Sequence, residues 1–386
     1  MLLKNKAILI ISPQAWGEMF ISKHHYALTL AKMGNKVYFL NPPETGNIKK
    51  AGQILISTSC THHNLLLIKH SLKFPFLLKF HATRVFHWLM GFHIQGILKK
   101  ISHPLDIIWS FDQGNLYPFK FFGKKPFKIF QPVDEPMNMQ AIKAAEGSHV
   151  ILSVTNDILE KYSAFEQPKH LINHGTGEDF LLPALTARHN KNIHVGLSGN
   201  LLRPDIDWDI FLKIVDQNPA IVFECWGSYS SVNNNIGGAE DQATKLFIRL
   251  LQQKGVILHG PASSVNLARE LHRMDAFLIC YDVKKDQSKG TNYHKIMEYL
   301  STGKVIIASN VSAYQVKPEL IEMVKERDSN ELLPLLFKKI INDLGNYNTP
   351  ELQLQRKKYA GANTYVNQVG RIQQIIHEEF GRSLIK

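Results

Sequence analysis

Short, wholly apolar runs alternate with segments of helical periodicity along most of the chain. Near the amino terminus, an apolar run at residues 7–12 precedes a helix-like segment that begins at Ser22 and ends at Gly34, and a second apolar run follows at 37–40. Continuous apolar runs are typical of buried parallel strands, and a helix between two of them is typical of a crossover connection. This part of the chain is therefore predicted to form a parallel sheet covered by helices.

The same alternation continues and then starts again after a polar, basic stretch at 183–192, which is predicted to be a linker. Further strands are predicted before this linker at 106–110, 128–130, 150–154 and 170–173. Strands are predicted after it at 193–197, 221–226, 256–259, 277–281 and 305–308, with helices at 208–216, 264–272 (capped by Ser264), 293–301 and 356–380. We therefore expect an α/β protein of two Rossmann-like, doubly wound domains, 1–182 and 193–359, with helix 360–386 packing back on the first.

Composition narrows the class of protein. The 386 residues are 44% hydrophobic and 20% charged, which excludes a disordered or fibrous chain. The three cysteines lie far apart and form no CxxC pair, so a reducing compartment is expected. No window of about 18 apolar residues is free of charge, and the amino terminus carries no signal-peptide pattern. A cytoplasmic protein without a membrane span is therefore predicted.

The charge is distributed unevenly. The formal net charge is +12, and no acidic residue lies between Glu44 and Asp106, where basic side chains alternate with aromatic ones. Such a segment suits an anionic surface, and we expect peripheral association with the inner face of the membrane. A solvated basic face on ordinary helices is the alternative. Nucleic acid is not expected as a partner, because no nucleic-acid-binding motif accompanies the charge.

The strongest candidate for chemistry is the segment 288–308, in which a glycine-containing loop enters a helix and a strand follows. A helix amino terminus offers free amides and a positive dipole to a phosphate. Lys295 and Glu298 are three residues apart and share a helix face. Lys295 is predicted to meet a diphosphate and Glu298 to accept hydrogen bonds from ribose hydroxyls. The alternative is an exposed Lys–Glu ion pair that stabilises the helix by only about 0.2–0.5 kcal/mol.

The segment 294–304 resembles the donor-binding segment of GT-B glycosyltransferases, especially those of family 4. Segments 23–34, 172–175, 195–201, 256–260 and 274–278 resemble other parts of the same family. The resemblance implies two domains facing each other across a cleft. It implies transfer of a sugar from a nucleotide diphosphate donor, without a required metal or other cofactor, in polysaccharide or cell-envelope synthesis. A saccharide or lipid-linked acceptor and retention of configuration are implied as well.

The sequence departs from the family pattern at three positions. Gly290 stands where the family often has a second Glu, Asn200 where it has a phosphate-binding Arg, and Val133 where it has a His before Asp134. Arg203 is the nearest replacement for the missing arginine, because its planar donors suit a diphosphate. The residues expected to bind the donor are Gly199, Asn200, Arg203, Gly260, Lys295 and Glu298.

The remaining candidates lie in loops at predicted strand ends or early in the first helix. Asp112 and Asp134 are the candidate bases for an acceptor hydroxyl, with His24 as a further catalytic candidate; loop capping is the alternative for both aspartates. Acceptor or loop roles are assigned to Trp16, Gly17, His25 and His174. The pattern Asp205-Ile206-Asp207 is predicted to cap the following helix rather than hold a metal.

Other functions remain open. A sugar-nucleotide epimerase can share this two-domain fold, but it has no use for the acid-free basic segment. A non-catalytic nucleotide-sugar-binding subunit would fit the departures from the family pattern. A nicotinamide dehydrogenase is disfavoured, because no GxGxxG follows the first apolar run.

Overall fold

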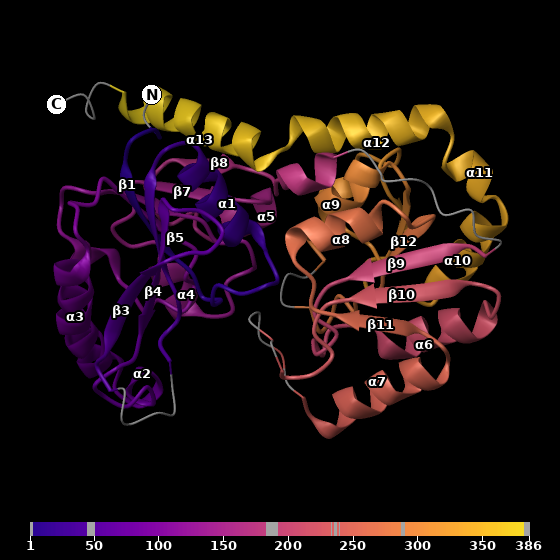
Figure 1. Cartoon of the computed structure of the whole chain (residues 1–386), viewed down its shortest axis with the longest axis horizontal. Coiled ribbons are helices and arrows are strands. Elements are labelled where there is room, and N and C mark those ends of the chain that lie inside the picture. Colours follow the sequence, from indigo (N-terminus) through magenta and orange to yellow (C-terminus); the bar gives the residue numbers. More distant parts are fainter. Residues whose placement is uncertain are drawn as a thin grey trace. The chain divides into compact units, whose positions relative to one another are not determined.

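The computed structural model describes residues 3–44, 51–182, 192–232, 234, 238, 240–286 and 290–381. The chain divides into two compact units, each built on its own sheet (Figure 1). The first unit comprises Met1–Trp16, Ser22–Asn173 and Gln368–Lys386, and the second comprises Gly17–Ile21 and His174–Asn367. The chain passes to the second unit at His174, earlier than the expected domain end at residue 182. Of the predicted linker 183–192, only Asn192 is among the described residues.

The first unit contains an eight-stranded sheet. Its strands lie in the order β3 Ile54–Thr58, β4 Leu65–His70, β2 Lys36–Leu40, β1 Ala7–Ile11, β5 Ile107–Ser110, β6 Phe127–Phe130, β7 Val150–Ser153 and β8 Lys169–Leu171. The predicted strand–helix–strand crossover is confirmed, because β1 and β2 pair in parallel on either side of α1 Ser22–Lys32. The sheet is parallel as predicted except at one edge, where β3 pairs antiparallel with β4.

Several elements of the first unit had no clear sequence signal. The edge strand β3 is largely exposed and ends in polar residues, so it lacks the apolar run that marks a buried strand. The 18-residue helix α3 Thr83–Lys100 carries aromatic residues on its exposed side as well as its buried side, which obscures its helical period. The other helices of this unit are α2 Leu78–His81, α4 Met139–Lys143, α5 Asn156–Glu160 and α13 Tyr365–Phe380.

The second unit contains a wholly parallel sheet. Its strands lie in the order β11 Ile257–Gly260, β10 Val222–Trp226, β9 His194–Ser198, β12 Ala276–Ile279, β13 Val305–Ala308 and β14 Glu322–Met323. Apart from β14, each of these strands was predicted to within two residues at each end. Because β9, β10 and β11 are parallel neighbours, their carboxyl ends meet at one edge of the sheet. Ligands of such folds bind at this edge.

Helices cover both faces of this second sheet (Figure 1). On one face lie α6 Trp208–Gln217, α7 Gln242–Gln253 and α10 Leu333–Asn342, and on the other lie α8 Ser264–Leu271, α9 Lys295–Thr302 and α12 Pro350–Ala362; α11 Leu344–Tyr347 connects α10 to α12. The predicted cap of α8 was wrong by one residue, because the Ser263 hydroxyl accepts the hydrogen bond from the Asn266 amide.

The expectation of one continuous helix over 356–380 was wrong. α12 ends at Ala362 and α13 begins at Tyr365. Between them the chain pairs with Thr176: the Thr176 amide donates to the Asn363 carbonyl at 2.8 Å, and the Tyr365 amide donates to the Thr176 carbonyl at 3.2 Å. These long-range bonds hold the backbone in an extended bridge, which local helical periodicity does not reveal.

Candidate functional site

A row of glycines lies along the carboxyl edge of three neighbouring strands of the second unit. Gly199 follows β9, Gly227 follows β10 and Gly260 ends β11, and their φ angles are 140°, 129° and 80°. The Gly199 amide donates to the Trp226 carbonyl and the Gly227 amide donates to the Gly260 carbonyl, each at 2.8 Å. A Cβ on Gly227 would overlap the Gly199 carbonyl. Glycine therefore keeps this edge narrow and leaves its backbone open to a close ligand.

The structure brings Lys295 to this glycine row. Lys295 is the first residue of α9, and its Nζ occupies the space that a Cβ on Gly199 would fill. The ammonium donates a 2.6 Å hydrogen bond to the Tyr281 hydroxyl and lies 4.9 Å from the centre of the same ring. The side chain is buried, so its charge has lost most of its hydration. A fixed, desolvated cation at a helix amino terminus is suited to a phosphate.

Ser198, Gly199, Asn200, Tyr281 and Lys295 are among the residues that line a small cavity at this edge. Its volume of about 20 Å³ is enough for one water-sized group. The Asn200 side-chain carbonyl accepts a 3.0 Å hydrogen bond from the Leu202 amide, so it holds the loop that follows β9. The cavity therefore has room for a single oxygen atom beside Lys295 and Gly199.

Glu298 lies one turn further along α9 and is buried among the residues of this helix. Burial raises the pKa of its carboxyl to about 8, against the opposing effect of the nearby Lys295 charge. The alternative of a solvent-exposed Lys–Glu pair is wrong, because both side chains are buried. A largely protonated carboxyl can both donate and accept hydrogen bonds, which suits the hydroxyls of a sugar.

Arg203 holds two loops of the second unit together. Its Nε donates to Asp205 at 2.8 Å, and one terminal nitrogen contacts both Asp205 and, at 3.1 Å, Asp286. Asp286 also accepts the Tyr293 hydroxyl at 2.6 Å and the Gly290 amide at 3.0 Å. Hydrogen bonding and charge from the carboxylates raise the pKa of Arg203 despite its burial. Its guanidinium is therefore occupied by carboxylates and braces the loop that leads into α9.

The two aspartates of the Asp205-Ile206-Asp207 pattern have separate structural tasks. Asp205 binds Arg203, whereas the Asp207 side chain accepts the Ile210 amide at 3.3 Å and caps α6. Asp207 also accepts a 2.8 Å hydrogen bond from Asn330. The prediction that this pattern caps the helix is confirmed for Asp207.

The candidate aspartates of the first unit lie after neighbouring strands. Both oxygens of buried Asp112 accept backbone amides, from Gly114 at 2.8 Å and from Leu116 at 2.7 Å. Burial raises the pKa of Asp112. Asp134 is half-buried, and its carbonyl accepts a 2.6 Å hydrogen bond from Gln113. Asp112 thus anchors its own loop by both oxygens.

Lys23 is a residue of this region that the sequence did not single out. Its Nζ donates to Gln14 at 2.5 Å and lies 5.9 Å from the centre of the Phe111 ring. Burial lowers the pKa of Lys23 to about 8, and the charges of Asp134 and Asp112 oppose this shift. A buried lysine whose pKa is strongly shifted is a candidate functional residue. Its place at the start of a helix after a glycine-containing loop was the available signal.

The structure places the remaining candidates in two groups. Trp16 packs edge-on against His24 at 5.3 Å between ring centres, and the His24 Nε2 lies 3.0 Å from the Ala15 carbonyl, so these residues shape the loop after β1. His25 is buried, and burial lowers its pKa to about 4, which keeps it neutral. Gly17 and His174 belong to the second unit, where the His174 ring lies 6.2 Å from that of His294.

Comparison with known proteins identifies the fold. No protein-family model and no curated protein matches the sequence. Sucrose-phosphate synthase from Thermosynechococcus elongatus superimposes with a TM-score of 0.70 at 13% identity, over 98% of this chain and 100% of that one. HepE from Anabaena in complex with UDP and glucose superimposes with a TM-score of 0.65 at 13% identity, over 96% of this chain and 99% of that one. The chain has the GT-B fold.

A third similar structure is described as trehalose-6-phosphate from E. coli bound with UDP-2-fluoro glucose. It superimposes with a TM-score of 0.65 at 11% identity, over 95% of this chain and 98% of that one. At these identities the comparison establishes the architecture of two doubly wound units and leaves individual residues to be argued from their contacts. In this GT-B chain the glycine row, Lys295 and Glu298 all lie in the unit for which the sequence resemblance implied donor binding.

Proposed function

We propose that this chain is a glycosyltransferase that transfers a sugar from a nucleoside diphosphate donor to a saccharide or lipid-linked acceptor. The observation that carries the proposal is the Lys295 ammonium, held against Gly199 at the carboxyl edge of the sheet, with the buried carboxyl of Glu298 one turn away. Lys295 would neutralise charge that develops on the departing diphosphate. Glu298 would bind ribose hydroxyls. Catalysis would use no metal or other cofactor.

A uridine diphosphate sugar is the first donor to test. HepE and the E. coli trehalose-6-phosphate structure have UDP or a UDP-sugar bound, and both share the fold of this chain. Membership of glycosyltransferase family 4, retention of configuration and a role in polysaccharide or cell-envelope synthesis are proposed from the sequence resemblance. Arg203 is left out of the proposed phosphate ligands, because two aspartates already bind its guanidinium.

For the acceptor we propose the carboxyl edge of the first sheet. Asp112 and Asp134 are both proposed as candidate bases at this edge, and the two oxygens of Asp112 accept backbone amides. The charge of Asp134 opposes the lowering of the Lys23 pKa that burial causes. His24 is assigned to shaping the loop after β1, since its ring contacts both Trp16 and the Ala15 carbonyl.

Calorimetry with UDP and a transfer assay with UDP-glucose test the proposal. We expect the Lys295→Ala protein to lose at least about tenfold in UDP affinity, because a charge-assisted hydrogen bond contributes about 1.5–3 kcal/mol. Lys338→Ala, on the exposed side of α10, is the matched control and should bind like the unaltered protein. Equal UDP affinity of both variants would contradict the assignment of Lys295 as a diphosphate ligand. An isomerised sugar nucleotide formed without acceptor would favour an epimerase, and binding without product with every acceptor would favour a non-catalytic subunit.

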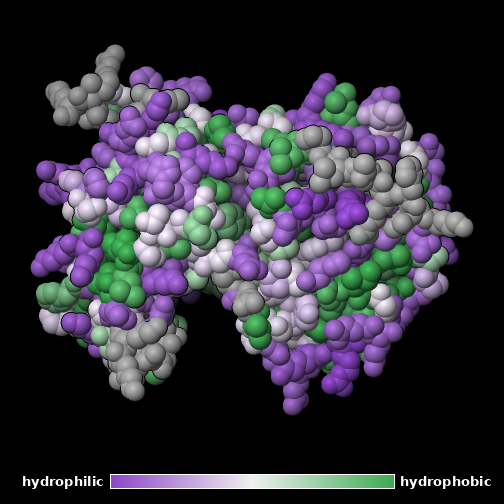
Figure 2. All heavy atoms as spheres, viewed as in Figure 1, coloured by the Kyte–Doolittle hydropathy of each residue, from purple (hydrophilic) through white to green (hydrophobic). Residues whose placement is uncertain are grey.

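We also propose that the first unit binds an anionic membrane surface peripherally. In the part of the chain that the structure describes, no helix is both long and apolar enough to cross a bilayer. Five large side chains nevertheless point into solvent from α2, α3 and the residue before α2; this α2–α3 apolar face consists of Leu77, Phe80, Val85, Trp88 and Phe92. In Figure 2 hydrophobic atoms (green) gather at the left of the first unit, between the places where Figure 1 shows α3 and β3.

The α2–α3 apolar face has the pattern of an interfacial helix. Val85, Trp88 and Phe92 are spaced three and four residues apart, so they share one side of α3, and Phe92 is 63% exposed. Phe86, Met90, Ile94 and Ile97 occupy the buried side. Basic residues accompany the exposed side chains, namely Lys79, Arg84, Lys99 and Lys100. Exposed aromatics bordered by cations suit the interface of an anionic bilayer.

A further inference from the structure

Two central strands of the second sheet, β9 and β12, separate toward their carboxyl ends. The ladder between β9 and β10 continues to Ser198 and Trp226, whereas the ladder between β9 and β12 ends at Gly196 and Phe277. The strand order of the sheet reverses at this pair, because the chain runs outward from β9 to β11 and then returns to β12. Residues that end or follow both strands, among them Ser198 and Tyr281, line the small cavity described above.

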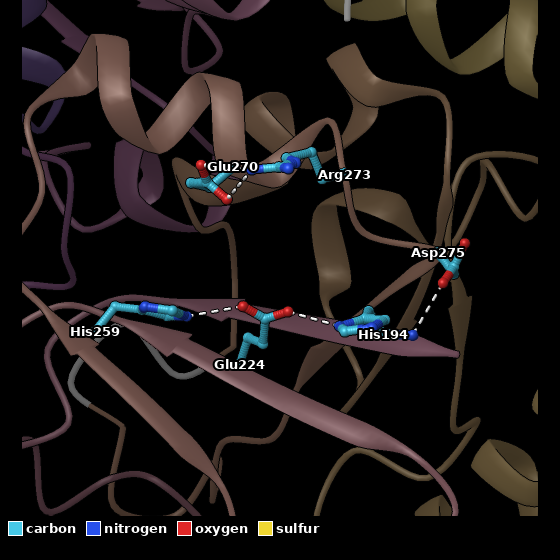
Figure 3. Close-up of polar contacts among 6 residues, drawn as sticks. All are labelled: His194, Glu224, His259, Glu270, Arg273 and Asp275. Carbon is cyan, nitrogen blue, oxygen red and sulfur yellow. Dashed lines mark hydrogen bonds and ion pairs between the residues drawn. The ribbon is translucent and has the colours of Figure 1, made fainter. Parts of the chain in front are cut away.

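The amino ends of the same two strands are joined. The His194 amide donates to the Asp275 carboxylate and the Asp275 amide donates to the His194 carbonyl, each at 2.9 Å. The His194 Nδ1 lies 2.6 Å from one oxygen of Glu224, whose other oxygen lies 2.8 Å from the His259 Nε2 (Figure 3). Side chains therefore fix the start of β9 to β10, β11 and β12, and the separation is confined to its carboxyl end.

The hydroxyl of Tyr299 lies where a neighbouring strand would pair with Ser198. It accepts hydrogen bonds from the Ser198 amide at 2.6 Å and from the Ser198 hydroxyl at 3.0 Å, and it donates to the Ser198 carbonyl at 3.5 Å. The Tyr299 ring is fully buried and stacks on Phe277, with 4.1 Å between ring centres and 6° between the planes. A buried backbone amide requires a partner, and Tyr299 supplies it.

Tyr299 and Lys295 reach the end of β9 from the same helix. They are four residues apart in α9, so they share one of its faces. Tyr299 binds Ser198, and the Lys295 Nζ fills the space beside the next residue, Gly199. The placement of the ammonium against the Gly199 backbone depends on how α9 lies against β9, and the Tyr299 hydroxyl fixes that placement.

We infer that Tyr299 is a positioning residue for the diphosphate, which acts through Ser198 to hold Gly199 at the Lys295 ammonium. This inference rests on the proposed function and adds a residue that does not itself contact the ligand. Electrostatic stabilisation of a charged group is strongest when the charges and donors are fixed before the group arrives. Tyr299→Phe tests the role, because it keeps the ring on Phe277 and removes only the hydroxyl.

Calorimetry with UDP, combined with a double-mutant cycle, separates positioning from general damage to the fold. We expect Tyr299→Phe to lose at least about threefold in UDP affinity. In a Lys295→Ala background the same substitution should change UDP affinity by less than about twofold, because the group it positions is gone. Ser198→Ala removes only the 3.0 Å contact and is the milder variant if Tyr299→Phe does not fold. It should also weaken UDP binding only where Lys295 is present.

Tyr162→Phe is the matched control. Tyr162 is a fully buried tyrosine of the first unit, and its hydroxyl donates to the Ala141 carbonyl at 3.4 Å. This variant should lose thermal stability, as Tyr299→Phe does, and should keep its UDP affinity. Thermal unfolding of each variant measures the stability, so that a loss of binding can be compared between variants that are similarly destabilised.

The outcomes distinguish this inference from the function on which it rests. If the unaltered protein binds none of UDP, ADP and GDP, the proposed function and the positioning role both fall. If Lys295→Ala weakens UDP binding while Tyr299→Phe and Ser198→Ala leave it unchanged, only the positioning role falls. The role is also overturned if Tyr299→Phe lowers the affinity equally with and without Lys295, or if Tyr162→Phe lowers it as much.

Discussion

The Lys295 ammonium and the Tyr281 hydroxyl are joined by a 2.6 Å hydrogen bond, and the same ammonium lies 4.9 Å from the centre of the Tyr281 ring. One residue thus provides a dipole and an aromatic face to a single buried cation. Neither contact cancels the charge, because both partners are neutral groups. Tyr281 therefore holds the ammonium at Gly199 and leaves its positive charge to act on an anion.

Tyr281 substitutions are expected to weaken diphosphate binding in two steps. Tyr281→Phe keeps the ring and removes one neutral hydrogen bond, which contributes about 0.5–1.5 kcal/mol, so UDP affinity should fall about two- to tenfold. Tyr281→Ala also removes the aromatic face and should lose more. Isothermal calorimetry measures both, with Tyr347→Phe in α11 as the control. A Tyr281→Phe protein that binds UDP more tightly would show that the hydroxyl competes with the phosphate for Lys295.

Gly227 is expected to tolerate no side chain. A Cβ there would overlap the Gly199 carbonyl, and its φ of 129° is itself unfavourable for other residues. Gly227→Ala should therefore lower the free energy of unfolding by more than the approximately 1–3 kcal/mol that backbone strain alone costs. Gly255→Ala is the matched control, because its φ is 78° and nothing lies within 4 Å of its Cβ. Thermal unfolding should show the larger loss at Gly227, and equal losses would contradict the close approach of the two loops.

The central strands of the second unit could be predicted well from the sequence because they are buried on both faces. Burial of that kind requires the apolar runs that mark β9, β12 and β13. Lys295 and Glu298 could be proposed as donor ligands because they share one helix with a glycine-containing loop before it. Both signals arise from residues that are close together in the chain, and such patterns can be recognised in a single sequence.

The rest of the site depends on contacts between distant segments. The bonds from Asp286 to Arg203 and from Glu224 to His194 and His259 join different strands and loops, and no spacing along the chain announces them. Gly227 was missed because a single glycine after a strand is common, and its significance comes from the Gly199 carbonyl beside it. The break between α12 and α13 was missed for the same reason, since Thr176 causes it.

Glu298 is expected to make the stability of the protein depend on pH. Its pKa is raised from 4.5 to about 8 in the folded chain. The folded state therefore keeps a proton that the unfolded state releases above pH 4.5, so stability falls as pH rises between these values and levels off above about 8. Glu298 therefore lowers the free energy of unfolding by at most about 1.4 kcal/mol for each pH unit in this range.

Glu298→Gln should remove that part of the pH dependence, because glutamine is neutral in both states. Denaturant unfolding between pH 5 and pH 8.5 measures it, and the free-energy difference between variant and unaltered protein should move in favour of the variant as pH rises. Glu319→Gln is the control, since its side chain is not buried in the site. A difference that stays constant with pH would contradict a raised pKa. UDP should also bind the variant less tightly if the carboxyl binds ribose.

The α2–α3 apolar face predicts selective binding to anionic vesicles. Burying a large apolar side chain contributes about 1.5–3 kcal/mol, so Trp88→Ser with Phe92→Ser should lower vesicle binding by at least about tenfold. Leu335→Ser, which changes a residue that is 65% exposed on α10, is the matched control and should bind normally. Co-sedimentation with phosphatidylglycerol and phosphatidylcholine vesicles measures the effect.

Salt distinguishes the two contributions of this face to membrane binding. Attraction between exposed lysines and anionic headgroups is screened over about 8 Å at physiological ionic strength, whereas apolar burial is not weakened by salt. Lys99→Gln with Lys100→Gln should therefore reduce the salt dependence of binding, and the Trp88 and Phe92 substitutions should lower binding at every salt concentration. Equal binding to both kinds of vesicle, or binding that none of these substitutions changes, would remove the membrane from the proposed function and leave the donor site untouched.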